Sequence, residues 1–317
     1  MTPLRHLAIA AALACVATGA SAQDFKHPVK VIVPFAAGGA TDQLARLLAP
    51  RLAKALGTTV QVENRAGASG QVGTAAVKSA APDGTTLLLA PDHAVVVVPL
   101  ISPTAGYHAI RDFAPLGQGA RYQWALSVPA SSPAKNLAGY VDLLRAKPQD
   151  ANYGIPLKGG VPEIIGTAIE RKAGVPLQAT PYSGSAAVLP PLAAGEISAG
   201  VTGEPEALAL SREGKIRIIA VSGGARSPVL PDVPTFEEAG FPGVNVNSFH
   251  AFYAPKALPP AMADTFNAAL RTVLKDDDVK RQIKDMPLVL DATDLEGAKR
   301  ELAKSQDFWE KATKPKK

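Results

Sequence analysis

Hydrophobic residues follow two alternating patterns along this chain of 317 residues. Short runs rich in valine, isoleucine and leucine predict buried strands at residues 29–33, 60–62 and 85–90. Apolar residues three or four positions apart predict a helix after Gly39, and its apolar face would consist of Leu44, Leu47, Leu48, Leu52, Ala55 and Leu56. A second helix, rich in small residues, would end near Ser79. Residues 29–90 therefore predict the order strand, helix, strand, helix, strand.

The same alternation continues to residue 221. The predicted strands cover residues 124–128, 152–155, 177–180, 197–201 and 216–221. The predicted helices cover residues 137–145, 162–173 and 206–213. Another helix would follow Gly184, and the pair Pro190-Pro191 would interrupt it. An extended segment at residues 247–253 and two amphipathic C-terminal helices complete the pattern.

This alternation is typical of an α/β fold, with mainly parallel sheets flanked by helices. In such sheets, ligands bind beyond the carboxyl ends of the strands. The chain is long enough for two lobes rather than one on the usual size of domains, and two lobes enclose a cleft. Several glycine-rich loops follow predicted strands, so we expect these loops to face that cleft.

The first 22 residues have the pattern of a cleaved export signal. Arg5 supplies a positive start, residues 7–17 form an apolar stretch too short to span a bilayer, and Ala20-Ser21-Ala22 is a typical cleavage site. No later run of the sequence is apolar for long enough to cross a membrane. The sequence therefore predicts a signal peptide at residues 1–22 and an exported mature protein.

Charge and cysteine content exclude several classes of function. The formal net charge is +5, with basic residues spread along the chain rather than clustered, so we predict no binding to nucleic acid. The single cysteine, Cys15, lies within the predicted signal, which excludes thiol chemistry and cysteine metal sites in the mature chain. The sequence contains neither a metal-binding histidine motif nor a cofactor motif, so we predict no metal and no cofactor.

The most informative segment is the turn at residues 34–42. Glycines Gly38 and Gly39 join a strand to a helix, and the first amides of a helix have no partner within it, which suits an anion. The turn lacks both the dinucleotide fingerprint and the phosphate-binding loop of nucleotide-binding proteins. Two simpler interpretations stay open: a turn that binds nothing, and Asp42 as an acid favoured by the helix dipole.

Other candidates are isolated polar residues near strand ends. His93 follows a buried strand, Lys158 lies on a glycine loop, and Tyr182 lies in the next loop. A secreted α/β enzyme with His93 as base and Asp42 as its orienting group is an alternative. This alternative lacks a nucleophile, since no G-x-S-x-G motif is present.

Several motifs in a fixed order resemble one known family. They are VKVIVPFAAGGATDQLARLLAPRLAKALG, VQVENRAGASGQVGTAAV, APDGTTLLLA, PYSG followed by LAAGEI, and IRIIAVSGGARSPVLPDVPTFEEAGFPG. Together they resemble the substrate-binding proteins of tripartite tricarboxylate transporters, the Bordetella uptake gene (Bug) family. The resemblance implies a two-lobed periplasmic binding protein of type II topology. Lobe 1 would comprise residues 23–124 and 248–317, lobe 2 residues 125–247, and hinges would lie near Trp124 and Ser248.

The same resemblance implies the ligand and the site. The protein would be a monomer that captures a small carboxylic acid, either a di- or tricarboxylate or an aromatic carboxylate, by closure of its lobes for membrane transporter subunits. A ligand-sensing role in signalling is an alternative. The first wall of the site would consist of Phe35, Ala37, Gly38, Gly39, Ala40, Thr41, Asp42, Pro91, Asp92 and His93. The opposite wall would consist of Lys158, Gly159, Gly160, Tyr182, Ser183, Gly184, Thr202, Gly203 and Glu204.

The second wall departs from the family pattern. Lys158 adds a positive charge, and Ser198 and Gly203 stand where aspartates are common in the family. A less negative wall would favour a ligand with a second anionic or acceptor group facing that lobe. We therefore expect Lys158 to contact such a group.

Overall fold

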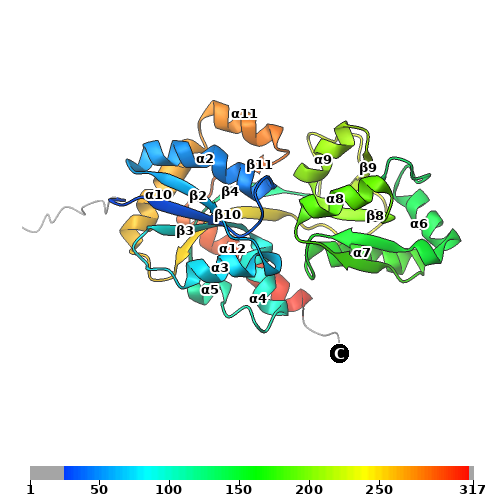
Figure 1. Ribbon diagram of the computed structural model, residues 1–317, viewed down its shortest axis with the longest axis horizontal. Helices are drawn as coiled ribbons and strands as arrows, with labels where there is room; N and C mark the ends of the chain where they lie inside the picture. The colour runs from blue at the N-terminus through cyan, green and yellow to red at the C-terminus, as the bar shows by residue number, and fades with distance from the viewer. Residues whose placement is uncertain (1–24, 314–317) are drawn as a thin grey trace, which may run out of the picture.

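The computed structural model describes residues 25–313, which form two lobes side by side (Figure 1). The predicted signal peptide lies outside this range. The sheet of the first lobe has the strand order β11-β4-β10-β3-β1-β2. Its strands are β1 (Val29–Val33), β2 (Val60–Asn64), β3 (Thr86–Pro91), β4 (Phe113–Tyr122), β10 (Ser248–Pro255) and β11 (Val289–Leu290). The first lobe therefore combines both ends of the described chain.

Helices cover both faces of this sheet, and they come from both ends of the sequence (Figure 1). The N-terminal part supplies α2 (Ala40–Leu56), η1 (Ala68–Gly70), α3 (Gln71–Lys78), the π-helix η2 (His93–Val97), α4 (Val98–Ile101) and α5 (Ala109–Asp112). The C-terminal part supplies α10 (Pro260–Val273), α11 (Asp277–Asp285) and α12 (Leu295–Ala312).

The second lobe consists of one continuous stretch of chain. Its sheet has the order β7-β6-β8-β5-β9. The strands are β5 (Trp124–Pro129), β6 (Asn152–Ile155), β7 (Gln178–Pro181), β8 (Ala199–Gly203) and β9 (Ile216–Val221). The helices are α6 (Leu137–Ala146), η3 (Pro148–Asp150), α7 (Val161–Ala173), α8 (Ser185–Ala194) and α9 (Glu204–Arg212).

Both sheets are mixed, which corrects the expectation of mainly parallel sheets. β1 runs parallel to β2 and β3, and β6 runs parallel to β7 and β8. β10 is antiparallel to β3 and β4, and β5 is antiparallel to β8 and β9. The reason is the connection between the lobes: β5 and β10 each begin just after the chain crosses over. Each enters its lobe from the edge where the parallel strands end, and so runs against them.

Helix α2 forms as its spacing predicts. The residues Leu44, Leu47, Leu48, Leu52 and Leu56 are buried, whereas Ala55 is exposed. The helix ends at Gly57, which adopts the left-handed conformation and donates its amide to the carbonyl of Ala53. At the start of α3, Gly73 packs so closely on β1 that a Cβ atom there would lie 2.8 Å from the Cα of Pro34. This packing fixes the turn between β1 and α2 against the sheet.

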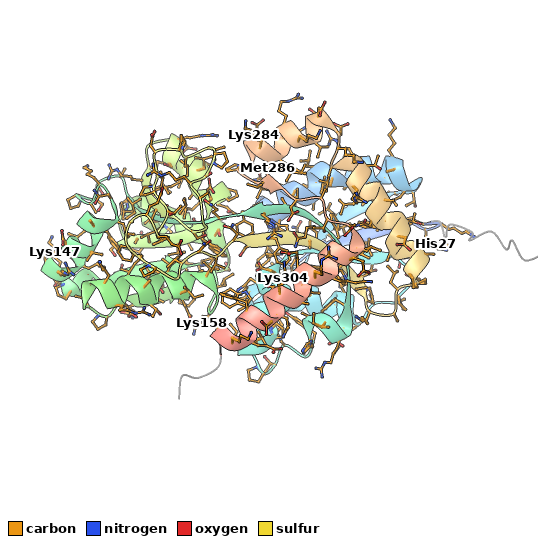
Figure 2. The ribbon with its side chains drawn as sticks, turned by 180° about the vertical axis from the view of Figure 1, so that it is seen from behind. His27, Lys147, Lys158, Lys284, Met286 and Lys304 are labelled. Carbon is orange, nitrogen blue, oxygen red and sulfur yellow. The ribbon has the colours of Figure 1, made fainter. Side chains whose placement is uncertain are left out.

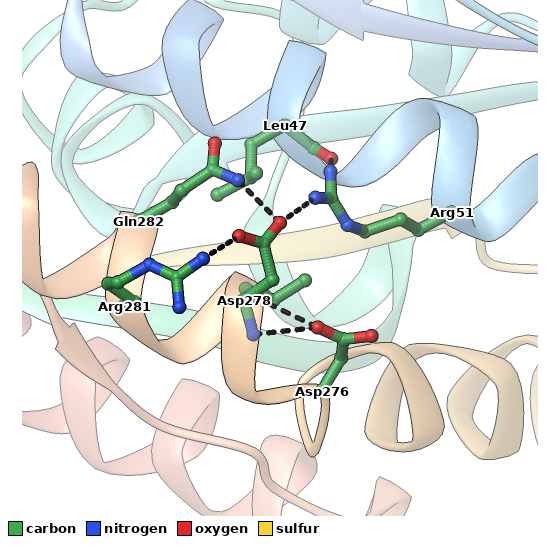
Figure 3. Close-up of polar contacts among 7 residues, drawn as sticks. Leu47, Arg51, Asp276, Asp278, Arg281 and Gln282 are labelled. Atoms are coloured by element: carbon green, nitrogen blue, oxygen red, sulfur yellow. Dashed lines mark hydrogen bonds and ion pairs between the residues drawn. The ribbon is translucent and has the colours of Figure 1, made fainter.

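Several elements differ from the sequence prediction. Helix α8 continues through Pro190 and Pro191 instead of being interrupted. Strand β4, with its ten residues, and helix α11 were not predicted. In Figure 3, Asp278 of α11 accepts hydrogen bonds from Arg51 of α2 and from Gln282, and this contact joins the C-terminal segment to the first helix.

Candidate ligand-binding cleft

A cleft opens where the carboxyl ends of the parallel strands of both lobes face each other. The first lobe contributes Phe35, Ala36, Ala37, Gly39, Ala40, Thr41, Asp42, Pro91, His93, Tyr122 and His250. The second lobe contributes Trp124, Pro156, Leu157, Ser183, Gly184, Ser185, Ala186, Gly203 and Glu206.

The first-lobe wall presents the N-terminus of α2. The amide of Gly38 donates to Asp42 Oδ2 at 2.8 Å, so this glycine does not offer its amide to a ligand. The amide of Ala40 donates to Glu206 Oε1, across the cleft, at 3.1 Å. Within residues 25–313, the amides of Thr41 and Asp42 donate to no protein acceptor. The helix therefore offers the amides of Thr41 and Asp42, three and four residues after Gly38, as donors to a ligand.

The carboxylate of Asp42 accepts hydrogen bonds from three residues of its own lobe. Its Oδ2 accepts from Gly38 and from Arg46 Nε at 3.0 Å, and its Oδ1 accepts from Asn64 at 2.9 Å. Burial acts to raise the pKa of Asp42, but the bonds from Arg46, Gly38 and Asn64 together hold it below the usual value. Asp42 thus fixes the turn as a charged group with protein partners.

Two buried histidines supply neutral polar groups. Burial lowers the pKa of His93 and of His250 to about 3, so both rings are uncharged at neutral pH. His250 Nε2 lies 3.0 Å from Thr41 Oγ1, and its ring stacks on that of Tyr122 with centroids 4.8 Å apart. Within the described chain, neither His93 Nε2 nor His250 Nδ1 has a hydrogen-bond partner. Buried polar groups normally have a partner, so these two nitrogen atoms are exceptions.

The second-lobe wall presents the N-terminus of α8. The amide of Gly184 donates to the carbonyl of Pro156 at 3.1 Å, and Ser185 Oγ accepts from the amide of Gly203 at 3.1 Å. The amides of Ser185 and Ala186, the first two of the helix, donate to no acceptor in the described residues. Two helix N-termini therefore face one cleft from opposite lobes, an arrangement that favours an anion.

Glu206 is the acidic side chain of this wall. It lies in the first turn of α9 and reaches the first amide of α2, as described above. Burial raises its pKa, and the bond from Ala40 opposes that rise. Its Oε2 occupies the space beside Gly203, 2.5 Å from where a Cβ of residue 203 would stand. Gly203 therefore leaves room for the Glu206 carboxylate.

The family assignment follows from comparison with known proteins. The chain matches the tripartite tricarboxylate transporter family receptor over residues 44–301. The chain belongs to this receptor family. Protein BugT of Bordetella pertussis is 30% identical over 278 residues, which cover 87% of this chain and 85% of BugT. The resemblance inferred from the sequence motifs is thereby confirmed.

Solved structures of similar proteins have the same fold. MatC from Rhodopseudomonas palustris with bound malate has a TM-score of 0.84 at 28% identity, with 91% of this chain and 99% of MatC covered. The R. palustris protein Rpa4515 with adipate has a TM-score of 0.85 at 30% identity, with 91% and 97% covered. These matches confirm the two-lobed periplasmic binding-protein fold.

Several predicted site residues of the receptor lie outside the cleft lining. They are Gly38, Asp92, Lys158, Gly159, Gly160, Tyr182, Thr202 and Glu204. Thr202 and Glu204 flank Gly203, and neighbouring residues at a strand end point in opposite directions. Glu204 instead donates its amide to the carbonyl of Gln123 and, as an acceptor, binds the hydroxyl of Ser227. Tyr182 packs against the core of the second lobe.

Lys158 is the main correction to the expected site. Its side chain is exposed and lies outside the cleft (Figure 2). The loop passes against the first lobe, where a Cβ at Gly159 would lie 2.4 Å from Ile101 Cδ1 and one at Gly160 would lie 2.9 Å from His93 Nδ1. The second wall therefore carries the acid Glu206, not the base Lys158. The positive charge expected on the second wall lies outside this lining.

Sequence reasoning also missed part of the lining. The missed residues are Tyr122, Trp124, Ser185, Ala186, Glu206 and His250. Ser185 and Ala186 adjoin the predicted Ser183 and Gly184, so a wider window around that glycine loop would have included them. Tyr122, Trp124 and His250 lie on strands at the crossings between lobes. No local pattern marks these as lining residues.

Residues 25–313 contain neither a metal cluster nor a membrane-spanning helix. No group of three or more histidine, aspartate or glutamate side chains there is arranged to hold a metal ion. In the same range, no helix has both the length and the apolar character needed to cross a bilayer.

Proposed function

We propose that this receptor captures a small carboxylic acid in the periplasm and presents it to the membrane subunits of a tripartite tricarboxylate transporter. One observation carries the proposal: two helix N-termini with unpaired amides, Thr41 and Asp42 on one side and Ser185 and Ala186 on the other, face one cleft. Related structures hold malate and adipate, both carboxylic acids, which supports the same ligand class here.

The available donors suffice for useful affinity. Hydrogen bonds to a charged group contribute about 1.5–3 kcal/mol each. The unpaired amides of the two helix N-termini offer several such bonds to a carboxylate that enters the cleft. A micromolar complex needs roughly −8 kcal/mol after the cost of immobilising the ligand. Neutral donors without a lysine or arginine can therefore hold an acid reversibly.

Lobe closure is the proposed mechanism of capture. The first lobe would comprise residues 23–124 and 248–317, and the second lobe residues 125–247. The division of strands between the two sheets supports these bounds, except that Trp124 already belongs to the sheet of the second lobe. The chain crosses just before Trp124 and again before Ser248, and Trp124 Nε1 donates to Ser248 Oγ at 3.0 Å. The hinge would therefore lie where both crossings are joined.

A thermal-denaturation panel tests the proposed function. Aliphatic dicarboxylates, citrate, amino acids and aromatic carboxylates are each compared with the corresponding amide, which has the same shape without the charge. An acid at a hundred times its dissociation constant adds about 2.7 kcal/mol to stability, whereas its amide should add almost nothing. Sodium sulfate at equal ionic strength controls for general anion effects. If no carboxylate of any class raises the melting temperature above this control, the proposal is wrong.

A further inference from the structure

The charge of the cleft lining does not suit a ligand with several carboxylates. The lining contains no lysine and no arginine. Its two histidines are neutral, and Asp42 is paired with Arg46, which lies outside the lining. Glu206 is then the one lining acid in residues 25–313 that has no basic side chain in ion-pair contact. The empty cleft therefore presents an unbalanced carboxylate to its ligand.

The position of Glu206 relates this carboxylate to the proposed anion site. Its Oε1 accepts from Ala40, the first residue of α2, at 3.1 Å. The next two amides of the same helix, those of Thr41 and Asp42, are unpaired. A ligand carboxylate that binds these two amides must lie directly beside Glu206. The acid therefore contacts the part of the ligand next to its carboxylate, not the distant end.

Two neighbouring carboxylates repel each other, and this repulsion is stronger in a desolvated cleft than in water. A cationic group on the ligand removes this cost, because it forms a charge-assisted hydrogen bond with Glu206 while the ligand carboxylate binds the amides. The group must be attached close to the ligand carboxylate to reach Glu206. An ammonium on the adjacent carbon fulfils this condition.

We propose that Glu206 makes the cleft selective for α-amino acids by accepting a hydrogen bond from the ligand ammonium group. The inference rests on the proposed binding of a carboxylate by the α2 amides. It replaces the expectation of a second anionic group on this wall, since the charge there is negative. Acids without the ammonium, including simple dicarboxylates, should bind more weakly than their amino counterparts.

Calorimetry on matched ligand pairs tests the inference. The pairs are aspartate and succinate, glutamate and glutarate, leucine and 4-methylpentanoate, and phenylalanine and 3-phenylpropionate. For the skeleton that fits the cleft, the wild-type receptor should bind the amino member roughly tenfold or more tightly, as expected of a charged hydrogen bond. In Glu206→Gln, which keeps the acceptor for Ala40, the two members should bind within about twofold of each other.

A matched control separates this effect from a general loss of charge. Glu213→Gln removes an exposed carboxylate at the end of the same helix and should keep the wild-type preference. The inference is overturned if wild-type protein prefers the acid without the amino group, or if Glu206→Gln retains the amino preference. It is also overturned if Glu206→Gln tightens both members equally, because Glu206 would then only compete for the Ala40 amide. If no acid of any kind binds wild-type protein, the proposed function itself fails.

Discussion

The two carboxylates of the cleft wall differ in what surrounds them. Asp42 accepts hydrogen bonds from Arg46, Gly38 and Asn64, which hold its pKa below the usual value against the effect of burial. Glu206 has the single cross-cleft bond from Ala40, and burial raises its pKa. The first acid is therefore part of the scaffold, whereas the second keeps the capacity to bind a donor.

Asp92 is a second carboxyl whose pKa is raised by burial. It is buried, and burial raises its pKa to about 7, while the hydroxyl of Ser248 and the amides of His93 and Phe249 act in the opposite direction. A carboxyl whose folded pKa exceeds its unfolded value binds more protons in the folded state. The favourable contribution of Asp92 to the free energy of unfolding is complete below pH 4 and is lost as the pH rises to about 7. Through Asp92, the free energy of unfolding should decline across this interval, whereas His93 and His250, whose folded pKa lies below the unfolded value, act in the opposite direction.

Asp92→Asn should remove the contribution of Asp92, because the amide does not ionise, while the contributions of the histidines stay the same in both proteins. In urea unfolding at pH 4.5, 6 and 7.5, the free energy of unfolding of the variant should increase relative to that of the wild type as the pH rises. The total gain should be about 3–4 kcal/mol, since each pKa unit corresponds to about 1.4 kcal/mol. Asp142→Asn, at an exposed position, serves as the control and should follow the wild type. Parallel pH profiles for Asp92→Asn and wild type would contradict the argument.

At the scale of single residues, the sequence predicted which loops reach the cleft better than it predicted individual contacts. Glycine turns such as Gly38-Gly39 and Ser183-Gly184 are visible as local patterns, and both loops reach the cleft. Glu206 and His250 come into the site through tertiary packing, 166 and 209 residues from their partners Ala40 and Thr41. Lys158 has a suggestive neighbourhood in sequence, but the path of its loop takes it to the surface. Such long-range placement leaves no local trace in a single sequence.

At the scale of elements, the first turn of α2 can be tested without damaging the helix. Ala40 is the first residue of α2, where proline is well tolerated, and Gly39 before it has an extended conformation that suits a following proline. Ala40→Pro removes the one amide that Glu206 occupies and places a methylene group against its carboxylate. We expect Glu206 to be displaced towards the neighbouring amides, and ligand affinity to fall by roughly ten- to hundredfold, as for the loss of a charged hydrogen bond.

The control for this change is proline at the first position of a helix remote from the cleft. Asp277→Pro in α11 meets the same requirement, since Asp276 before it is extended and Asp277 is exposed. Calorimetry should show wild-type affinity for Asp277→Pro and weakened binding for Ala40→Pro, with similar circular dichroism for both. Unchanged affinity in Ala40→Pro would exclude the α2 terminus from the anion site.

Helix α11 depends on its cap. Asp276 accepts from the amides of Asp278 at 2.8 Å and Val279 at 3.2 Å (Figure 3). Replacing such a cap with alanine costs about 1 kcal/mol. Asp276→Ala should therefore lower the unfolding free energy by about this amount and increase hydrogen exchange in α11. Arg51→Ala removes only a half-exposed ion pair with Asp278 and should cost less. A larger loss in Arg51→Ala than in Asp276→Ala would contradict this order.

The alternation of strands and helices could be predicted because each element carries its own periodic pattern. Strand β4 escaped prediction because Pro115, Gly117 and Gly119 interrupt it, residues that normally weaken a strand. The strand lies between β10 and β11. Its packing accounts for one of these glycines, because a Cβ at Gly117 would lie 2.8 Å from the side chain of Asn267. The packing of α10 on this strand thus selects a residue that the local pattern disfavours.

At the scale of the whole molecule, the two lobes share one strand order. Each sheet combines three parallel strands with an antiparallel strand that starts at a crossing, β10 in the first lobe and β5 in the second. This arrangement brings the carboxyl ends of the parallel strands of both lobes to one cleft. The crossing strands lie beside it, and Tyr122, Trp124 and His250 at their ends line it. We therefore expect ligand and hinge to share residues, so that occupancy of the cleft is coupled to the proposed lobe closure.

Trp124 can report this coupling directly. The chain has two tryptophans, and Trp309 lies in α12, so Trp309→Phe leaves Trp124 as the one tryptophan. Because Trp124 lines the cleft and binds Ser248 across the crossings, a charged ligand and closure should both alter its emission. The fluorescence of Trp309→Phe should change with ligand and saturate at the affinity measured by calorimetry, while X-ray scattering shows a smaller radius of gyration. Binding without any change in this variant would place the ligand, or the hinge, away from Trp124.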